Sequence, residues 1–254
     1  MTAIQFDAFA DAYQRSVERS TGFTGRNLEF FHRRKIEMLI RLGRRHLGTL
    51  RSASVLDVGC GVGITDNMLR PHVGSLHGVD VSAAMVEQAG RRNPDCIYQA
   101  YDGECLPFAD STFDLVMTIC VVHHVPPHQW EAFTSELVRV TRPGGLVTII
   151  EHNRLNPLTR RAVSTCEFDE DAVLVPQRRI ARLLDKAGAG PVETRHFLFS
   201  PLGGRVGAEI DHVLAAFPLG GQYVSAARRR VECAPRARDP KAGGAASIGL
   251  VTTR

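Results

Sequence analysis

The sequence TIIEHNRLNP, at positions 148–157, runs from apolar residues directly into a carboxylate, an imidazole and a carboxamide. A histidine held in one tautomer by a neighbouring group can remove a proton from an alcohol, a phenol or a carbon acid. We therefore expect His152 to act as a general base, with Glu151 or Asn153 fixing its tautomer, and we count Glu151 as catalytic with it. The alternative is that His152 only supports its loop. Because side chains alternate along a strand, all three can face one cavity only if the strand has already ended.

A second group of imidazoles, His123 and His124, follows another apolar run at 114–122. We expect the pair, and His123 above all, to orient its loop through hydrogen bonds, and we keep His124 as a candidate catalytic residue. His32 is a further histidine that could face the pocket. No histidine or cysteine has the spacing of metal ligands, so we expect no metal.

The segment Val55–Thr65, VLDVGCGVGIT, places three glycines at alternate positions between an apolar run and a helical one. Glycines there allow left-handed turns and let a ligand approach the backbone, beside a helix N-terminus with free N–H groups. Asp80, 21 residues after Gly59, could accept both hydroxyls of an adenosine ribose. A dinucleotide fingerprint needs glycine where this chain has Ile64 and an apolar residue where it has Asp57. The loop therefore suits an adenosyl ligand without a pyrophosphate, which argues against a nicotinamide-dependent dehydrogenase.

These segments resemble those of class I S-adenosylmethionine-dependent methyltransferases, in particular bacterial small-molecule enzymes of secondary metabolism. The resemblance covers roughly residues 50–152. DVGCGVG is similar to the family's D-x-G-x-G-x-G loop, YDGECLPFADSTFDLV to its acidic loop, and RVTRPGGLVTII to its helix-Pro-Gly-Gly-strand segment. The resemblance implies a Rossmann-like α/β fold, S-adenosyl-L-methionine as the cofactor, and methyl transfer as the activity.

The resemblance also assigns cofactor contacts, one short group of residues for each part of the cofactor. These are Asp57, Gly59, Gly61 and Gly63 for the methionine end, Asp80 and Val81 for the ribose and adenine, Asp102 and Gly103 for the base, the backbone of Ile119 and Cys120 near the sulfonium, and Tyr13 packed over the cofactor. For Tyr13, plain core packing is the alternative.

The elements that must position these residues follow from the hydrophobic periodicity. The first fifty residues have a helical rhythm, with a break at Gly22 and Gly25. From Val55 onward, short apolar strands alternate with helices, one of them at about 129–140, which is typical of a parallel sheet with helices on both faces. We expect a Rossmann-like, doubly wound, mostly parallel sheet of seven strands with a final antiparallel strand.

The composition divides the chain into three parts. We expect an N-terminal helical cap at 1–50, a methyltransferase domain at 51–230 with a substrate-binding insertion at about 153–175, and a disordered basic tail at 231–254. Seven basic and two acidic side chains in 228–254 give that segment a charge of +5, which leaves −1 for the rest of a chain with net charge +4. The nearly neutral body favours a small-molecule substrate, and we interpret the basic residues between positions 33 and 51 as a solvated helix face.

The N-terminus lacks the apolar core of a signal peptide, and no apolar run approaches the ~18 residues of a membrane span. The six cysteines are scattered, so we expect reduced thiols in a cytoplasmic protein without membrane partners.

Together these features predict a monomeric or homodimeric methyltransferase that acts on an oxygen or nitrogen of a small metabolite, and less readily on carbon. Two alternatives stay open. Methylation of a nucleic acid or a protein side chain would need a basic surface next to the pocket, made of Arg33, Arg34, Lys35 and Arg44. The other alternative is a catalytically silent partner protein that only binds the cofactor.

Overall fold

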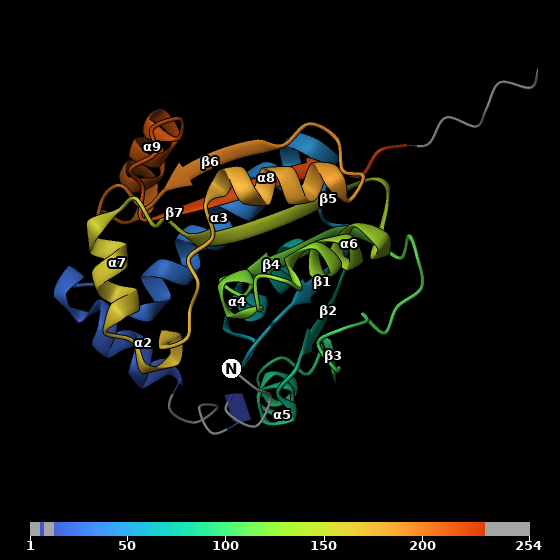
Figure 1. Cartoon of the computed structure of the whole chain (residues 1–254), viewed down its shortest axis with the longest axis horizontal. Coiled ribbons are helices and arrows are strands. Elements are labelled where there is room, and N and C mark those ends of the chain that lie inside the picture. The colour runs from blue at the N-terminus through green and yellow to red at the C-terminus, as the bar shows by residue number, and fades with distance from the viewer. Residues whose placement is uncertain (1–5, 8–12, 232–254) are drawn as a thin grey trace, which may run out of the picture.

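The centre of the molecule is a seven-stranded sheet in the order β3-β2-β1-β4-β5-β7-β6, shown in Figure 1. The computed structural model describes residues 6–7 and 13–231. Its strands are β1 (Ser54–Val58), β2 (Ser75–Asp80), β3 (Ile97–Ala100), β4 (Phe113–Ile119), β5 (Thr141–His152), β6 (Glu193–Phe197) and β7 (Gln222–Arg228). The first five strands are parallel, and β7 runs antiparallel to both β5 and β6. The predicted fold class, including the antiparallel last strand, is confirmed.

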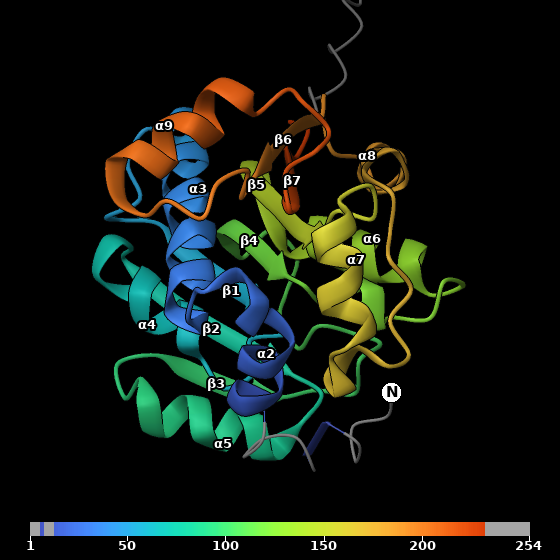
Figure 2. The same ribbon diagram turned by 90° about the vertical axis from the view of Figure 1, so that its left-hand side faces the viewer.

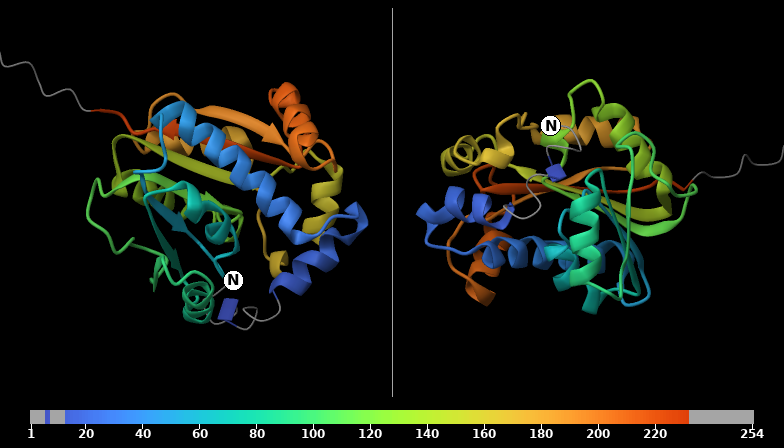
Figure 3. Two further views of the ribbon diagram at one scale, coloured as in Figure 1. Left: turned by 180° about the vertical axis from the view of Figure 1, so that it is seen from behind. Right: turned by 90° about the horizontal axis from the view of Figure 1, so that it is seen from below.

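Helices cover both faces of this sheet. They are α2 (Tyr13–Thr21), α3 (Leu28–Leu47), α4 (Ile64–Leu69), α5 (Ala83–Arg92), α6 (Trp130–Val140), α7 (Pro157–Ser164), α8 (Gln177–Lys186) and α9 (Gly204–Leu214), with 3-10 turns η1 (Gly22–Thr24), η2 (Arg70–His72), η3 (Val122–His124) and η4 (Glu167–Asp169). Figure 2 shows α3, α4 and α9 on one side of the sheet and α6 and α8 on the other. Seen from behind, α3 runs along the back of the sheet (Figure 3).

Each face of the sheet carries its own apolar core. One core packs α6 and α8, with residues such as Trp130, Leu137 and Ile180, against the sheet. The other packs α3, with Leu39 and Leu42, against the opposite side of the same strands. Burial of the strands on both faces explains why their sequences are almost continuously apolar.

Helices α3 and α5 each begin at a side-chain cap. The side chain of Asn27 accepts a hydrogen bond from the N–H of Phe30 at the start of α3, and Ser82 does the same for Met85 at the start of α5. The predicted break between two N-terminal helices is confirmed: α2 ends at Thr21, and the next helix starts at Leu28.

The polar ends of the parallel strands meet beneath a helical cover. Helices α2 and α7 contact each other, and in Figure 2 they lie in front of the carboxyl ends of the strands. Of the described helices, none is long and apolar enough to cross a membrane. The division into cap, domain and insertion stays a prediction, and the predicted tail from residue 232 lies outside the described residues, as does the side chain of Tyr13.

Candidate functional site

The glycine loop after β1 forms the floor of the first cavity. The N–H groups of Gly59 and Cys60 both donate to the carbonyl of Val79, at 2.7 and 3.0 Å, which ties the loop to β2. Gly59 has φ +80°, and a Cβ there would lie 2.4 Å from a methyl group of Val121, so any side chain would be strained and would have to displace Val121. Gly61 has φ +52°, but a Cβ there would meet nothing closer than 3.9 Å, because this glycine faces open space in the cavity.

Three buried carboxyl groups stand beside this loop. Asp80 accepts hydrogen bonds from the N–H of Gly61 and of Ser82, each at 2.9 Å. Burial raises the pKa of Asp57, and the negative charges of Asp66 and Asp80 raise it further, against the opposing charge of Lys35. Burial also raises the pKa of Asp66 to about 6. Asp57 Oδ1 is buried and has no hydrogen-bond partner in the described chain.

The first cavity, here called the loop cavity, has a volume of about 410 Å³. The predicted cofactor residues whose side chains or backbone line it are Asp57, Gly59, Gly61, Asp80, Val81, Asp102, Gly103, Ile119 and Cys120. Gly63 is not among its walls; it sits at φ +70° as the N-cap of α4, so its contribution is to the turn. Asp102 is exposed and accepts the N–H groups of Glu104 and Cys105, bonds that lower its pKa.

A second cavity of about 450 Å³, here called the apolar cavity, lies beside the first. Five phenylalanines line it: Phe23, Phe30, Phe31, Phe168 and Phe199. Its polar end carries Cys120, His123, His124, His152 and Gln222. The two cavities share the walls made by His32, Lys35, Cys120, His124 and Phe168, so a group in one can approach a group in the other.

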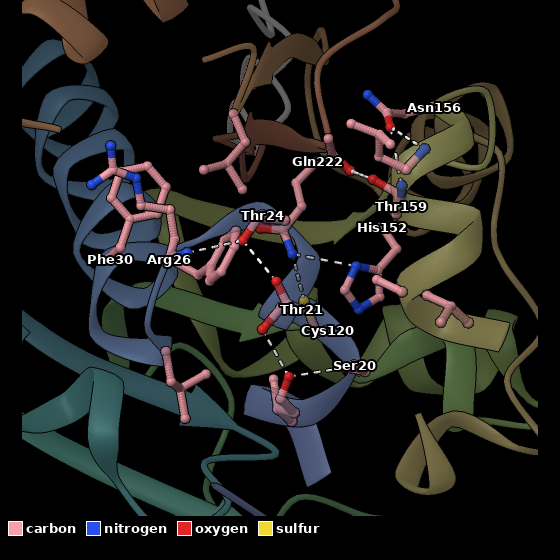
Figure 4. Close-up of a pocket in the computed structure, with 18 of the residues that line it drawn as sticks. Ser20, Thr21, Thr24, Arg26, Phe30, Cys120, His152, Asn156, Thr159 and Gln222 are labelled. Atoms are coloured by element: carbon pink, nitrogen blue, oxygen red, sulfur yellow. Dashed lines mark hydrogen bonds between the residues drawn. The ribbon is translucent and has the colours of Figure 1, made fainter. Parts of the chain in front are cut away.

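Cys120 lies at the junction, on a backbone with φ +58° that few residues other than glycine adopt. Gln222 reaches from β7 toward both Cys120 and His152, as Figure 4 shows. Its Nε2 lies 3.4 Å from Cys120 Sγ and 3.3 Å from His152 Nδ1. Burial raises the pKa of Cys120, but the positive charge of Lys35 and the neighbouring His152 outweigh burial and bring it to about 7.

The prediction that Glu151 or Asn153 fixes the tautomer of His152 is wrong. Glu151 is fully buried and lines neither cavity; its carboxylate accepts the N–H of Val122 at 2.8 Å and contacts Nδ1 of His123 at 2.6 Å. Asn153 is also turned away, and its amide donates to the carbonyls of Pro218 and Gly220. Strand β5 continues through residue 152, so alternation separates these side chains. Glu151 is thus a positioning residue for His123 and not a group that touches a ligand.

His123 stands between two carboxylates. Beyond Glu151, its Nε2 lies 3.4 Å from Oδ1 of Asp169, which comes from the insertion after β5. Burial alone would lower the pKa of His123, but the two carboxylate charges outweigh burial and raise it. Burial and the neighbouring His123 lower the pKa of His124 to about 3, so His124 is neutral at pH 7. The roles predicted for His152 and His124 as bases stay predictions; both line the apolar cavity.

The basic stretch of α3 is only partly a solvated face, which corrects the interpretation from sequence. Arg34 is buried and pairs with Asp211 and Glu37, and Lys35 is buried with its side chain lining both cavities. Lys35 is the one Lys or Arg side chain among the described residues that line the loop cavity. The basic surface that a nucleic-acid substrate would need therefore lacks two of its four members.

Sequence reasoning missed Lys35 and Gln222. Lys35 is next to Ile36 and one helical turn before Leu39, both of which are buried. These apolar neighbours at helical spacing were the available sign that position 35 faces inward. Gln222 carries no local signal, because it begins a strand that is separated from Cys120 by 102 residues.

Comparison with known proteins shows which type of domain the central part of the chain matches. The family model described as a methyltransferase domain matches residues 55–145. Demethylmenaquinone methyltransferase of Beutenbergia cavernae is 37% identical over 105 residues, which cover 41% of this chain and 43% of that protein. Malonyl-[acyl-carrier protein] O-methyltransferase of Pseudescherichia vulneris is 40% identical over 106 residues, 40% of this chain and 39% of that protein. The chain therefore spans less than half the length of these relatives.

Similarity in fold extends further than similarity in sequence. The crystal structure of a SAM-dependent methyltransferase from Thermotoga maritima, described as a possible histamine N-methyltransferase, has a TM-score of 0.65 at 18% identity. The superposition covers 89% of this chain and 98% of that one. Residues 55–145 of this chain therefore match a methyltransferase domain, and the solved structure shows that the chain shares the fold of such enzymes.

Proposed function

We propose that this protein is a methyltransferase that transfers a methyl group from S-adenosylmethionine to an oxygen or nitrogen of a small molecule held in the apolar cavity. The observation that carries the proposal is the pair of cavities that meet at Cys120. A cofactor in one and an acceptor in the other would approach each other at this junction. Such proximity is the main requirement of a displacement reaction.

The loop cavity fits the chemistry of the cofactor. Its amino-acid end carries a carboxylate and an ammonium group, and the cavity offers the buried cation of Lys35 and the unpartnered Oδ1 of Asp57. Gly61 leaves room for the ligand against the backbone. Asp80 stands at the end of β2, with each carboxylate oxygen keeping a lone pair for a ribose hydroxyl. Asp102 and Gly103 would hold the base.

When bound, S-adenosylmethionine supplies a methyl group already activated by a sulfonium. The protein's own residues then have to orient the acceptor and let its proton leave. The phenylalanine walls of the apolar cavity would hold an apolar body, and the imidazoles at its polar end face the acceptor group. Of the relatives, the malonyl-[acyl-carrier protein] O-methyltransferase is named for transfer to oxygen, which supports an oxygen acceptor here.

The orientation of the Gln222 amide decides which ring nitrogen of a neutral His152 carries the proton. With Nε2 toward His152 Nδ1, as observed, Gln222 donates and His152 keeps its proton on Nε2. Oε1 of Gln222 is buried without a partner among the described residues. Turning the amide over lets Oε1 accept from Nδ1–H and frees the lone pair of Nε2, so Gln222 is a positioning residue for His152.

Calorimetry with S-adenosylmethionine and with its demethylated product tests the cofactor. We expect one site per chain, and a loss of affinity in Asp80→Ala; a wild-type chain that binds neither compound would refute the proposal. Incubation with labelled cofactor and a metabolite extract, followed by mass spectrometry, should yield a product heavier by one methyl group.

The acceptor side needs its own test. We expect His152→Ala to lower turnover by about 10²–10⁴-fold while affinity for the demethylated cofactor stays unchanged. Cofactor binding without turnover on any acceptor would instead support the catalytically silent partner protein. Action on a small molecule without nucleic acid, as a monomer or homodimer, stays a prediction.

A further inference from the structure

Three side chains at the polar end of the apolar cavity converge although they come from distant segments. His123 belongs to the turn η3 after β4, His152 ends β5, and Asp169 lies in η4 of the insertion. One donor atom from each lies within 4.8 Å of the other two. The set is two imidazoles and one carboxylate, and it opens on the apolar cavity, which all three residues line.

One pair of donor atoms in this cluster is poorly placed for a hydrogen bond but spaced like two ligands of one ion. His123 Nε2 and Asp169 Oδ1 lie 3.4 Å apart, and Nε2 forms no hydrogen bond within the described chain. Two ligands on a tetrahedral ion with bonds of about 2.0–2.1 Å lie about 3.3 Å apart. His123 is 1% exposed, so this unpartnered nitrogen is buried and points at the cluster.

The groups behind the ligands are those that orient metal-binding histidines. Glu151 Oε2 holds Nδ1 of His123 at 2.6 Å, which leaves Nε2 directed at the cluster. A carboxylate on the far nitrogen of a ligating histidine fixes its ring and raises its basicity. Gln222 contacts Nδ1 of His152 at 3.3 Å and has a free carbonyl oxygen that can play the same part.

The charge of the cluster also favours a cation. Glu151 is fully buried, the side chain of Asp169 is 12% exposed, and neither carboxylate pairs with a Lys or Arg among the described residues. Only histidine protons offset these two carboxylates. Carboxylates with so little exposure and no Lys or Arg partner are costly, and a divalent ion would balance both.

We propose that His123, His152 and Asp169 form a binding site for a divalent transition-metal ion. Two imidazoles and a carboxylate suit Zn²⁺, Fe²⁺, Co²⁺ or Ni²⁺ and not Mg²⁺. The two donor atoms of the cluster that lie farthest apart, at up to 4.8 Å, have to approach each other by about 1.5 Å to bind the same ion. The open face of the ion looks into the apolar cavity, where an oxygen donor of the acceptor would bind; this last step rests on the proposed function. His152 is then a ligand and not a free base.

The test uses the full chain, freed of metal by chelation and titrated with Co²⁺ at pH 8. We expect one Co²⁺ per chain, visible d–d absorption typical of a site with few ligands, and loss of the bands on adding Zn²⁺. His152→Ala and Asp169→Asn should weaken Co²⁺ binding by more than the about 10–100-fold expected of Glu151→Gln, which removes only the supporting carboxylate.

His196→Gln is the matched control, because His196 is also buried with both ring nitrogens unpartnered, yet it lies in β6 away from the cluster. It should bind Co²⁺ as the wild type does. Calorimetry with the demethylated cofactor shows that each variant is folded. If the wild-type chain gives no Co²⁺ bands, or if His152→Ala and Asp169→Asn bind Co²⁺ unchanged, the site does not exist. A chain that binds Co²⁺ but no cofactor would refute the proposed function and leave the metal site standing.

Discussion

His32 makes stability depend on pH in a way that one substitution can isolate. The imidazole is 5% exposed, and neither ring nitrogen has a partner among the described residues. Burial, together with the charges of Lys35 and Arg92, lowers its pKa from 6.5 to about 3. Because the folded pKa is depressed, the unfolded chain binds the proton first, and stability is lost as pH falls from 6.5 toward 3.

The loss of stability depends on how far the pH falls into the range between the unfolded and the folded pKa of His32. A pH of 5.0 lies ~1.5 units below the pKa of about 6.5 of the imidazole in the unfolded chain. Each pH unit in this range changes the free energy of unfolding by about 1.36 kcal/mol. His32 should therefore cost about 2 kcal/mol of unfolding free energy between pH 7.5 and pH 5.0. In His32→Leu that contribution disappears, so the variant should lose about 2 kcal/mol less than the wild type over the same change.

Urea unfolding at both pH values measures the difference, with the fluorescence of Trp130, the one tryptophan of the chain, as the signal. Comparing the two proteins cancels the titration of every other group. His128→Gln, on an exposed residue, is the control and should behave as the wild type. Equal losses in His32→Leu and the wild type would refute the assignment of His32 as a buried, neutral histidine.

Four further substitutions test the site and its scaffold. Gly59→Ala should lower the unfolding free energy by about 2–4 kcal/mol through strain and a clash. Gly61→Ala should lower it by only about 1–2 kcal/mol but abolish binding of the demethylated cofactor. Urea unfolding measures the first effect and calorimetry the second, and the reverse pattern would contradict the loop geometry. Lys35→Met should weaken that binding by about 10–100-fold, the worth of one charged hydrogen bond, and unchanged affinity would remove Lys35 from the cofactor site. Asn153→Ala removes the donor from the buried carbonyl of Gly220 and from the carbonyl of the exposed Pro218, and should lower the unfolding free energy by about 1–3 kcal/mol. A loss well under about 1 kcal/mol would mean that water replaces the amide.

Local patterns in the sequence were sufficient for the fold and for the glycine loop. Alternation of apolar strands and helices predicted the seven-stranded sheet, because each element buries its own apolar face whatever its distant neighbours are. The loop from Gly59 to Gly63 was also predictable, since its turn depends on backbone freedom within a few residues. Asp80 lies at the end of the next strand, where spacing along the chain fixes its position.

The partners of the polar groups were decided only by the tertiary structure. Glu151 binds His123, 28 residues away, and not the adjacent His152, because alternation turns neighbours on a strand to opposite sides. Gln222 meets His152 across 70 residues because β7 inserts antiparallel beside β5. In the same way α3, packed against the sheet, buries Lys35, a lysine that sequence alone assigned to the surface. Sequence determined which chemical groups are available at the strand ends, and packing determined which of them meet.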